Sequence, residues 1–322
     1  MDLQDGINHT LSLIFNQIEH HLRQRNLEGL NQEPFVLGLT GLQGSGKSTW
    51  ANGIVRRLRE THALNAITIS LDDLYKTHDD LLLVRKQNPH NRLLRTRGQP
   101  GTHDVQLARS FFDKIRALKK DEEICIPSFD KSRYAGEGDR APIHTWTRVT
   151  GPVDVVVFEG WCLGFSPLSS LQLKEKHQHA QEIQSEQEAD TQRSTSTLGD
   201  HPICHLELVN KSLCNYSEAF SGPQHFDALI HIDTNDLKNV YEWRWQQEQA
   251  LVRKKGSGMT EEQVNSFVRG YMPAYEMYLE HLRNGFFPEP QVDYHGNPVV
   301  EPKIQIRVLL DRHRVVRSIE AI

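Results

Sequence analysis

The sequence predicts a doubly wound α/β fold, in which helices flank a mostly parallel sheet. Short apolar runs typical of strands alternate with segments whose apolar residues recur at helical spacing. The strand-like runs lie at 35–40, 66–71, 153–158, 228–232 and 304–310. The run 153–158 is apolar except for Asp154, which is typical of a strand buried on both faces of a parallel sheet. Ligands of such folds bind beyond the carboxyl ends of the strands, so function is expected there.

The first 33 residues predict an N-terminal helical extension. This helix is expected to pack beside the unit 34–322, which carries the sheet, and it contains no recognisable chemistry. Its apolar residues at helical spacing are Leu11, Ile14, Phe15, Ile18 and Leu22.

A glycine-rich motif separates the first strand from the next helix. It fits G-x-x-x-x-G-K-[ST], whose glycines let backbone N–H groups curve around phosphate oxygens. Lys47 is expected to contact the outer phosphates, and the Ser48 hydroxyl to ligate Mg²⁺. The motif follows a strand and precedes a helical pattern, so it predicts a nucleotide-binding P-loop. Its residues are Gly41, Leu42, Gln43, Gly44, Ser45, Gly46, Lys47, Ser48 and Thr49.

The remaining elements continue the alternation. The strand 66–71 is followed by Asp72 and Asp73, and the strand 153–158 by Glu159, which places carboxylates at the carboxyl edge of the sheet. A helix is predicted over 105–119. A later helical stripe, which Pro273 is expected to kink or restart, is typical of the core. This stripe consists of Val264, Phe267, Tyr271, Tyr275, Tyr278 and Leu282.

Residues 168–200 differ in composition from the rest of the chain. Gln, Glu, Ser, Thr and His dominate there, and large apolar residues are scarce. Such a segment buries too little apolar surface to offset the entropy of ordering. We therefore predict a disordered, solvated insertion that catalysis does not need.

Composition and charge argue against several classes of protein. The chain has 322 residues, 37% of them hydrophobic, which suits a globular protein with a sizeable core. No apolar stretch approaches the roughly 18 residues of a membrane span. The net charge of -5 disfavours nucleic acid as a partner. The cysteines form no C-x-x-C pair, so we expect reduced thiols and a cytosolic location, with the nucleus as a second compartment.

Further motifs discriminate among P-loop proteins. The absence of the guanine-reading N-K-x-D and of L-S-G-G-Q disfavours GTPases and transporter ATPases, and favours ATP. Residues 70–75 resemble a motif of the phosphoribulokinase, uridine kinase and pantothenate kinase superfamily. The stretches 85–104, 127–132, 136–140 and 158–161 look like plant D-glycerate 3-kinase and its fungal relatives. This similarity covers about residues 35–285 and implies an Mg²⁺-ATP-dependent kinase of a small acceptor.

The resemblance implies roles for the carboxylates. Asp72 is the expected general base that takes the proton from the acceptor hydroxyl, a task suited to a positioned carboxylate. Asp73 either binds Mg²⁺ through water or caps the next helix. Glu159 stands where these kinases keep an acidic residue near Mg²⁺. The candidate metal ligands are therefore Ser48, Asp73 and Glu159.

The resemblance also implies basic groups around the acceptor. Arg97, Lys131 and Arg140 are expected to hold the acceptor's carboxylate or the transferring phosphoryl group, with a surface salt bridge as the alternative for each. The other candidates for acceptor binding are Asp73, His103 and Asp104. A mobile lid is implied over 241–262, where Arg244 is expected to close over the phosphates.

The sequence as a whole favours a kinase of a small anionic metabolite, with D-glycerate converted to 3-phosphoglycerate as the lead reaction. One alternative is another acceptor, such as a nucleoside, pantothenate or a sugar phosphate. A second is a nucleotide-dependent binding or regulatory protein that performs no transfer. Asp72, Glu159 and the basic residues favour the kinase, because a pure binding module needs none of them. The sequence indicates no oligomeric state.

Overall fold

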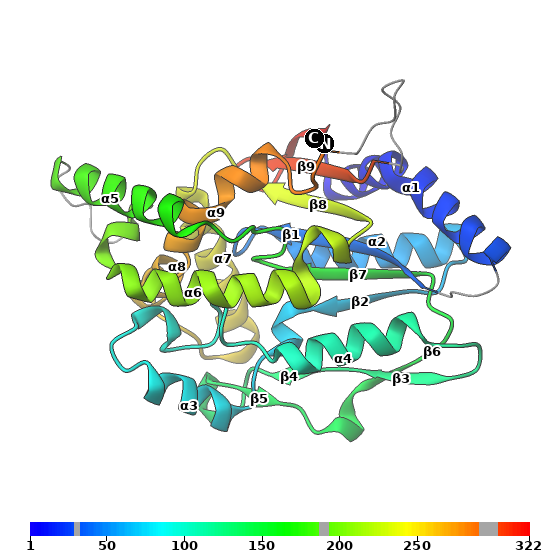
Figure 1. Ribbon diagram of the computed structural model, residues 1–322, viewed down its shortest axis with the longest axis horizontal. Coiled ribbons are helices and arrows are strands. Elements are labelled where there is room, and N and C mark those ends of the chain that lie inside the picture. The colour runs from blue at the N-terminus through cyan, green and yellow to red at the C-terminus, as the bar shows by residue number, and fades with distance from the viewer. Residues whose placement is uncertain (29–32, 187–192, 290–301) are drawn as a thin grey trace.

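A six-stranded sheet forms the centre of the computed structural model (Figure 1). The structure describes residues 1–28, 33–186, 193–289 and 302–322. The strand order is β10-β9-β8-β1-β7-β2. Neighbouring strands pair in parallel from β2 to β9, and β10 pairs antiparallel with β9, so the predicted mostly parallel sheet is confirmed. The strands are β1 (Phe35–Gly41), β2 (Ala66–Ser70), β7 (Val155–Gly160), β8 (Ala228–Asp233), β9 (Ile304–Leu310) and β10 (Val316–Ala321).

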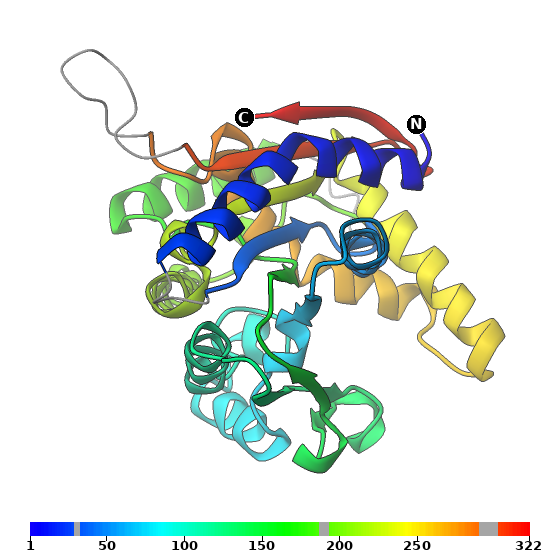
Figure 2. The same cartoon turned by 90° about the vertical axis from the view of Figure 1, so that its right-hand side faces the viewer.

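Helices cover both faces of this sheet. Figure 2 shows α2 (Lys47–His62) on one face and α4 (Val105–Arg116) and α6 (Ile203–Tyr216) on the other. Because both faces are covered, every residue of β1, β7 and β8 is buried. The N-terminal helix α1 (Leu3–Glu28) lies against α2, where Ile7 and Ile14 are buried.

Two small sheets and a helix are inserted in sequence between β2 and β7, and lie below the main sheet in Figure 1. They are built from β3 (Glu123–Ile126) with β6 (Thr147–Thr150), β4 (Phe129–Asp130) with β5 (Asp139–Arg140), and α3 (His78–Gln87). The β4–β5 hairpin contacts the short 3-10 helix Leu71–Leu74 that follows β2. The hairpin therefore brings Lys131 and Arg140, two of the predicted acceptor-binding residues, to the carboxyl end of β2.

Three helices follow β8: α7 (Lys238–Lys255), α8 (Glu261–Arg269) and α9 (Met272–Asn284). The predicted lid, 241–262, falls on α7, the following loop and the first residues of α8. A capping box formed by Thr260 and Gln263 begins α8. Pro273 lies in the first turn of α9, so the predicted apolar stripe is divided between two helices and restarts there.

The segment 168–200 differs from its prediction. Residues 170–186 form the helix α5 (Ser170–Glu186), so the expectation of a disordered insertion is wrong for this part. Leu173 is 1% exposed, and His177 Nε2 lies 2.8 Å from the carbonyl oxygen of His201. A few apolar residues on one face suffice to hold such a helix, although its composition is mostly polar. Residues 187–192 of the segment lie outside the described residues.

The main hydrophobic core lies between the sheet and its helices, with Trp50, Phe158 and Trp243 among its largest buried side chains. No helix within the described ranges combines the length and the apolar character that crossing a membrane requires.

Candidate active site

The P-loop joins β1 to α2 at the carboxyl edge of the sheet. Gly44 and Gly46 have φ values of 76° and 95°, a region that glycine adopts without steric cost. A Cβ on Gly44 would lie 2.8 Å from Trp243 Cβ and 2.9 Å from Arg244 N. Glycine is therefore required at position 44, because α7 approaches the loop so closely.

Two hydrogen bonds fix the loop within the protein. Lys47 Nζ donates to the carbonyl of Leu42 at 3.0 Å, and the N–H of Gln43 donates to Tyr275 Oη at 3.1 Å. Burial lowers the pKa of Lys47, against the opposing charges of Glu159 and Asp72. The predicted P-loop residues, Gly41 through Thr49, thus lead directly into the N-terminus of α2, an arrangement suited to phosphate.

A carboxylate and two hydroxyls meet beside the P-loop. Glu159 is the fifth residue of β7 and pairs in register with Ser70 of β2. Its Oε1 accepts hydrogen bonds from Ser48 Oγ at 3.0 Å and from Ser70 Oγ at 2.9 Å. Hard oxygen donors of this kind suit Mg²⁺, which binds through one or two carboxylates, water and phosphate oxygens. The chemistry of Ser48 and Glu159 therefore fits this metal.

Asp73 does not join this oxygen cluster. Its Oδ1 accepts the N–H of Phe129 at 3.1 Å, which ties the turn after β2 to β4. The hydroxyl of Ser70, not Asp73, caps the 3-10 helix Leu71–Leu74 by accepting the N–H of Asp72. The next helix, α3, is capped by the side chain of Thr77, so Asp73 does not have the predicted capping role and makes a tethering contact instead. Burial raises the pKa of the Asp73 carboxyl to about 6.

Asp72 lies at the centre of the acceptor side. Lys131 Nζ donates to its Oδ2 at 2.6 Å, and Tyr75 Oη donates to its Oδ1 at 3.0 Å. Burial favours the neutral carboxyl, but the Lys131 ammonium and the Tyr75 hydroxyl outweigh burial and lower the pKa of Asp72. Asp72 is therefore an ionised carboxylate whose charge is already compensated.

His103 is held as a neutral imidazole by Tyr216. The Tyr216 hydroxyl accepts the N–H groups of Gly101 at 2.7 Å and His103 at 2.9 Å, which occupies both lone pairs. Its own proton must then go to His103 Nδ1, 3.0 Å away, so Nε2 carries the ring proton. Burial lowers the pKa of His103 to about 3. Nε2 is buried and has no hydrogen-bond partner among the described residues, so it is a donor without an acceptor.

The remaining predicted acceptor residues are engaged within the protein. Arg140 Nη2 donates to Asp104 Oδ2 at 2.6 Å, and Asp104 also caps α4 by accepting the N–H of Leu107. Arg97 Nη1 donates to the carbonyls of residues 136 and 137, and its guanidinium lies 5.5 Å from the ring centre of Phe129. The pair Arg140–Asp104 therefore matches the salt-bridge alternative in this structure.

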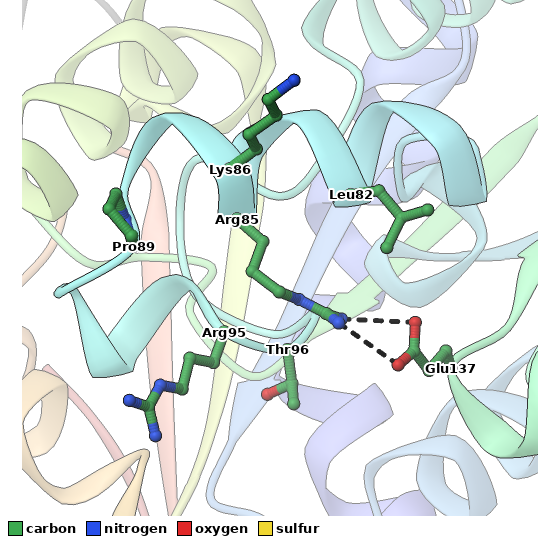
Figure 3. Close-up of a pocket in the computed structure, with 7 residues that line it drawn as sticks. All are labelled: Leu82, Arg85, Lys86, Pro89, Arg95, Thr96 and Glu137. Carbon is green, nitrogen blue, oxygen red and sulfur yellow. Dashed lines mark hydrogen bonds and ion pairs between the residues drawn. The ribbon is translucent and has the colours of Figure 1, made fainter.

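A cavity of about 440 Å³ lies outside this cluster. Figure 3 shows Arg85 reaching across it to Glu137, and Arg85 Nη1 and Nη2 donate to the carboxylate at 3.3 and 3.2 Å. The Lys86 and Arg95 side chains extend away from that ion pair. The cavity is lined by Leu82, Arg85, Lys86, Pro89, Arg95, Thr96 and Glu137, none of which was predicted to act in the reaction.

Arg244 lies on α7 next to the P-loop. Its Nη1 is 2.7 Å from Oε2 of Glu248, whose side chain is 2% exposed, and its guanidinium lies 5.1 Å from the ring centre of Phe267. The backbone of Arg244 lies against Gly44. In this structure the predicted lid arginine is thus placed at the loop, with its charge paired to a carboxylate of its own helix.

The sequence alone missed several groups that contact the site. Arg314, in the turn between β9 and β10, donates to Gly44 O and Trp243 O at 2.8 and 2.9 Å, across 270 residues of sequence in the first case. Tyr216 was not singled out because nothing in its local pattern marks a hydroxyl that binds a distant histidine. Tyr75 is the last residue of the motif 70–75, but the sequence did not predict its contact with Asp72.

Comparison with known proteins gives relatives over almost the whole chain. Kinase mug58 of Schizosaccharomyces pombe, described as uncharacterized, is 35% identical over 90% of this chain and 99% of its own length. Chloroplastic D-glycerate 3-kinase of Arabidopsis thaliana is 36% identical over 79% of this chain and 50% of its own length. The solved structure of D-glycerate 3-kinase from Cryptococcus neoformans is 30% identical, with a TM-score of 0.80, and covers 98% of this chain and 99% of that chain.

No family model matches the chain. The similarity to these kinases confirms the resemblance drawn from residues 35–285. The chain is therefore a kinase, and it belongs to the P-loop kinase family that includes mug58 and the D-glycerate 3-kinases.

Proposed function

We propose that this kinase transfers the γ-phosphoryl group of Mg²⁺-ATP to a hydroxyl of a small anionic metabolite, with D-glycerate as the lead acceptor and 3-phosphoglycerate as its product. The observation that carries the proposal is the arrangement of two clusters. Ser48 and Glu159 lie at the P-loop. Asp72, paired with Lys131, follows β2, the strand that neighbours β7 and its Glu159. The identity to D-glycerate 3-kinases supports the choice of acceptor.

The nucleotide side is assigned to the P-loop. The N–H groups of residues 41–49 and the N-terminus of α2 bind the phosphates, and Lys47 exchanges the Leu42 carbonyl for an outer phosphate oxygen. Ser48 and Glu159 hold Mg²⁺, which neutralises charge on the transferring group when bound. The family of P-loop kinases supports both the nucleotide and the metal.

The acceptor side is assigned to the turn after β2. Asp72 accepts the proton of the attacking hydroxyl, and Lys131 and Tyr75 keep this carboxylate ionised and oriented. Arg97 and His103 Nε2 contact the acceptor. Asp73 and the pair Arg140–Asp104 fix the surrounding loops rather than the substrate.

Arg244 is assigned to the lid. We propose that the backbone of Arg244 stays against the P-loop, and that its guanidinium exchanges Glu248 for the transferring phosphoryl group. A guanidinium placed there stabilises the charge that is spread over the phosphoryl oxygens in the transition state.

The test is ADP release by the purified protein with Mg²⁺-ATP and a panel of acceptors: small hydroxy acids, nucleosides, pantothenate and sugar phosphates. D-Glycerate is expected to stimulate release, and Asp72→Asn is expected to lower the rate by about 10²- to 10⁴-fold while ATP binding is retained. Stimulation by another compound would keep the kinase and change the acceptor. No stimulation by any compound, with ATP still bound, would favour a nucleotide-dependent regulatory protein.

A further inference from the structure

Tyr271, just before α9, carries a hydroxyl that has no hydrogen-bond partner in the described part of the chain. The residue is 7% exposed, and its ring packs edge-on against Trp161 with ring centres 4.7 Å apart. The next two tyrosines along α9 differ. Tyr275 Oη accepts the N–H of Gln43, and Tyr278 Oη donates to Asn210 Oδ1 at 3.1 Å. The Tyr271 hydroxyl, on an otherwise nearly buried side chain, is therefore available to a bound ligand.

The Tyr271 hydroxyl faces the loop that carries Arg97. A Cβ placed on Gly98 would lie 2.5 Å from Tyr271 Oη, and Gly98 has a φ of 143°, so glycine is needed there on both counts. Trp161 Nε1 donates to Gly98 O at 3.0 Å, which fixes the loop against the phenol. The hydroxyl is thus held beside the loop assigned to the acceptor.

Charges from three parts of the site reach this hydroxyl. Burial raises the pKa of Tyr271, the Asp72 carboxylate raises it further, and the guanidinium groups of Arg97 and Arg244 lower it. The net shift is upward, so the phenol keeps its proton and acts as a hydrogen-bond donor. Asp72 follows β2, Arg97 lies in the acceptor loop and Arg244 lies on α7, so Tyr271 sits where these elements converge.

We propose that the Tyr271 hydroxyl donates a hydrogen bond to a carboxylate oxygen of a small hydroxy acid bound as acceptor. This inference rests on the proposed function. The acceptor is favoured over ATP because the hydroxyl touches Gly98, next to Arg97, whereas the tyrosine at the P-loop is Tyr275. A neutral donor suits this place, since the ammonium of Lys131 is already engaged with Asp72.

The test compares Tyr271→Phe with the matched control Tyr278→Phe. Phenylalanine keeps the ring contacts with Trp161 and removes a hydroxyl that has no partner, so the variant is expected to fold. The KM for D-glycerate should rise roughly tenfold in Tyr271→Phe, with the KM for ATP unchanged. Tyr278 is not part of the site, and its variant should match the wild type in both KM values.

Glycerol, which lacks the carboxylate, provides the second arm. The ratio of kcat/KM for D-glycerate over glycerol should fall roughly tenfold in Tyr271→Phe and stay constant in Tyr278→Phe. Equal ratios in all three proteins, or a rise confined to the KM for ATP, would overturn the inference while the proposed function stands. A wild-type protein that turns over no hydroxy acid would instead refute the proposed function, so the two failures are distinguishable.

Discussion

Lys131 donates a hydrogen bond of 2.6 Å to Asp72, the carboxylate that follows β2. The ammonium comes from the β4–β5 hairpin, 59 residues further along the chain. The ammonium lowers the pKa of Asp72 against the effect of partial burial, and so favours the ionised form of the base. Through Lys131, the β4–β5 hairpin therefore acts directly on the expected general base.

Replacing Lys131 by Ala should shift the pH dependence of the reaction. The ammonium lowers the pKa of Asp72, so its removal raises that pKa and keeps the base protonated to a higher pH. The acidic limb of kcat/KM should therefore move to higher pH, as measured from initial rates between about pH 5 and 8. Lys176→Ala, which removes an exposed ion pair with Glu280, is the control. An acidic limb that is the same in both variants would show that Lys131 does not set the ionisation of the base.

Glu159→Gln should weaken the dependence on Mg²⁺ without unfolding the protein. The amide keeps an oxygen for Ser48 and Ser70 but loses the negative charge that a divalent cation requires. The Mg²⁺ concentration for half-maximal rate is expected to rise by about 10- to 100-fold, measured by titration at saturating ATP. Glu123→Gln, at an exposed ion pair with Arg148, should leave the titration unchanged. A wild-type titration in the Glu159→Gln variant would remove Glu159 from the metal site.

The fold could be predicted from sequence because its signals are local. The strands β1 and β7 begin with apolar runs, and the P-loop lies between β1 and a helix whose apolar residues recur at helical spacing. The helix α5 was missed because its apolar face is narrow, and composition does not distinguish such a helix from a disordered segment. Local patterns therefore identify elements with a broad apolar face, but not a mostly polar helix that a few buried residues hold in place.

The site could be predicted only in part, because much of it depends on contacts between distant segments. Asp72 follows β2 and Glu159 ends the apolar run of β7, so their placement at the same edge of the sheet was foreseeable. Tyr271 lies in a stripe that looks the same as a core stripe, and only the structure shows that its hydroxyl lacks a partner among the described residues. Arg314 contacts the P-loop from a turn near the C-terminus, and no local sequence pattern predicts this contact.

His103 should make the protein less stable in acid. Its pKa is about 3 in the folded protein, because burial disfavours the charged ring, against an ordinary value of 6.5 in the unfolded chain. The unfolded state therefore binds more protons below pH 6.5, and the stability that the neutral ring contributes is lost as the pH falls from 6.5 towards 3. Between pH 7 and 5 this linkage lowers the free energy of unfolding by about 2 kcal/mol.

Urea unfolding at pH 7 and 5 checks this expectation. His103→Gln cannot titrate, so the loss of stability between the two pH values should be smaller in this variant than in the wild type by about 2 kcal/mol. His9→Gln, at an exposed position on α1, should retain the wild-type difference. The same loss in wild type and His103→Gln would mean that the buried ring is not the group that takes up the proton.

Arg314→Ala should weaken ATP binding although the residue lies outside the P-loop. The guanidinium donates to Gly44 O, Trp243 O and Gln246 Oε1, so it joins the phosphate-binding loop to the helix that carries Arg244. Each of these is a charge-assisted hydrogen bond, and their loss releases the Gly44 peptide and the first turns of α7. The KM for ATP is expected to rise roughly tenfold, with a smaller effect on the KM for the acceptor. Arg317→Ala removes an exposed ion pair with Asp311 in the same hairpin and should change neither value. If the two variants have the same KM for ATP, the Arg314 contacts only hold the C-terminal hairpin in place and do not position the loop.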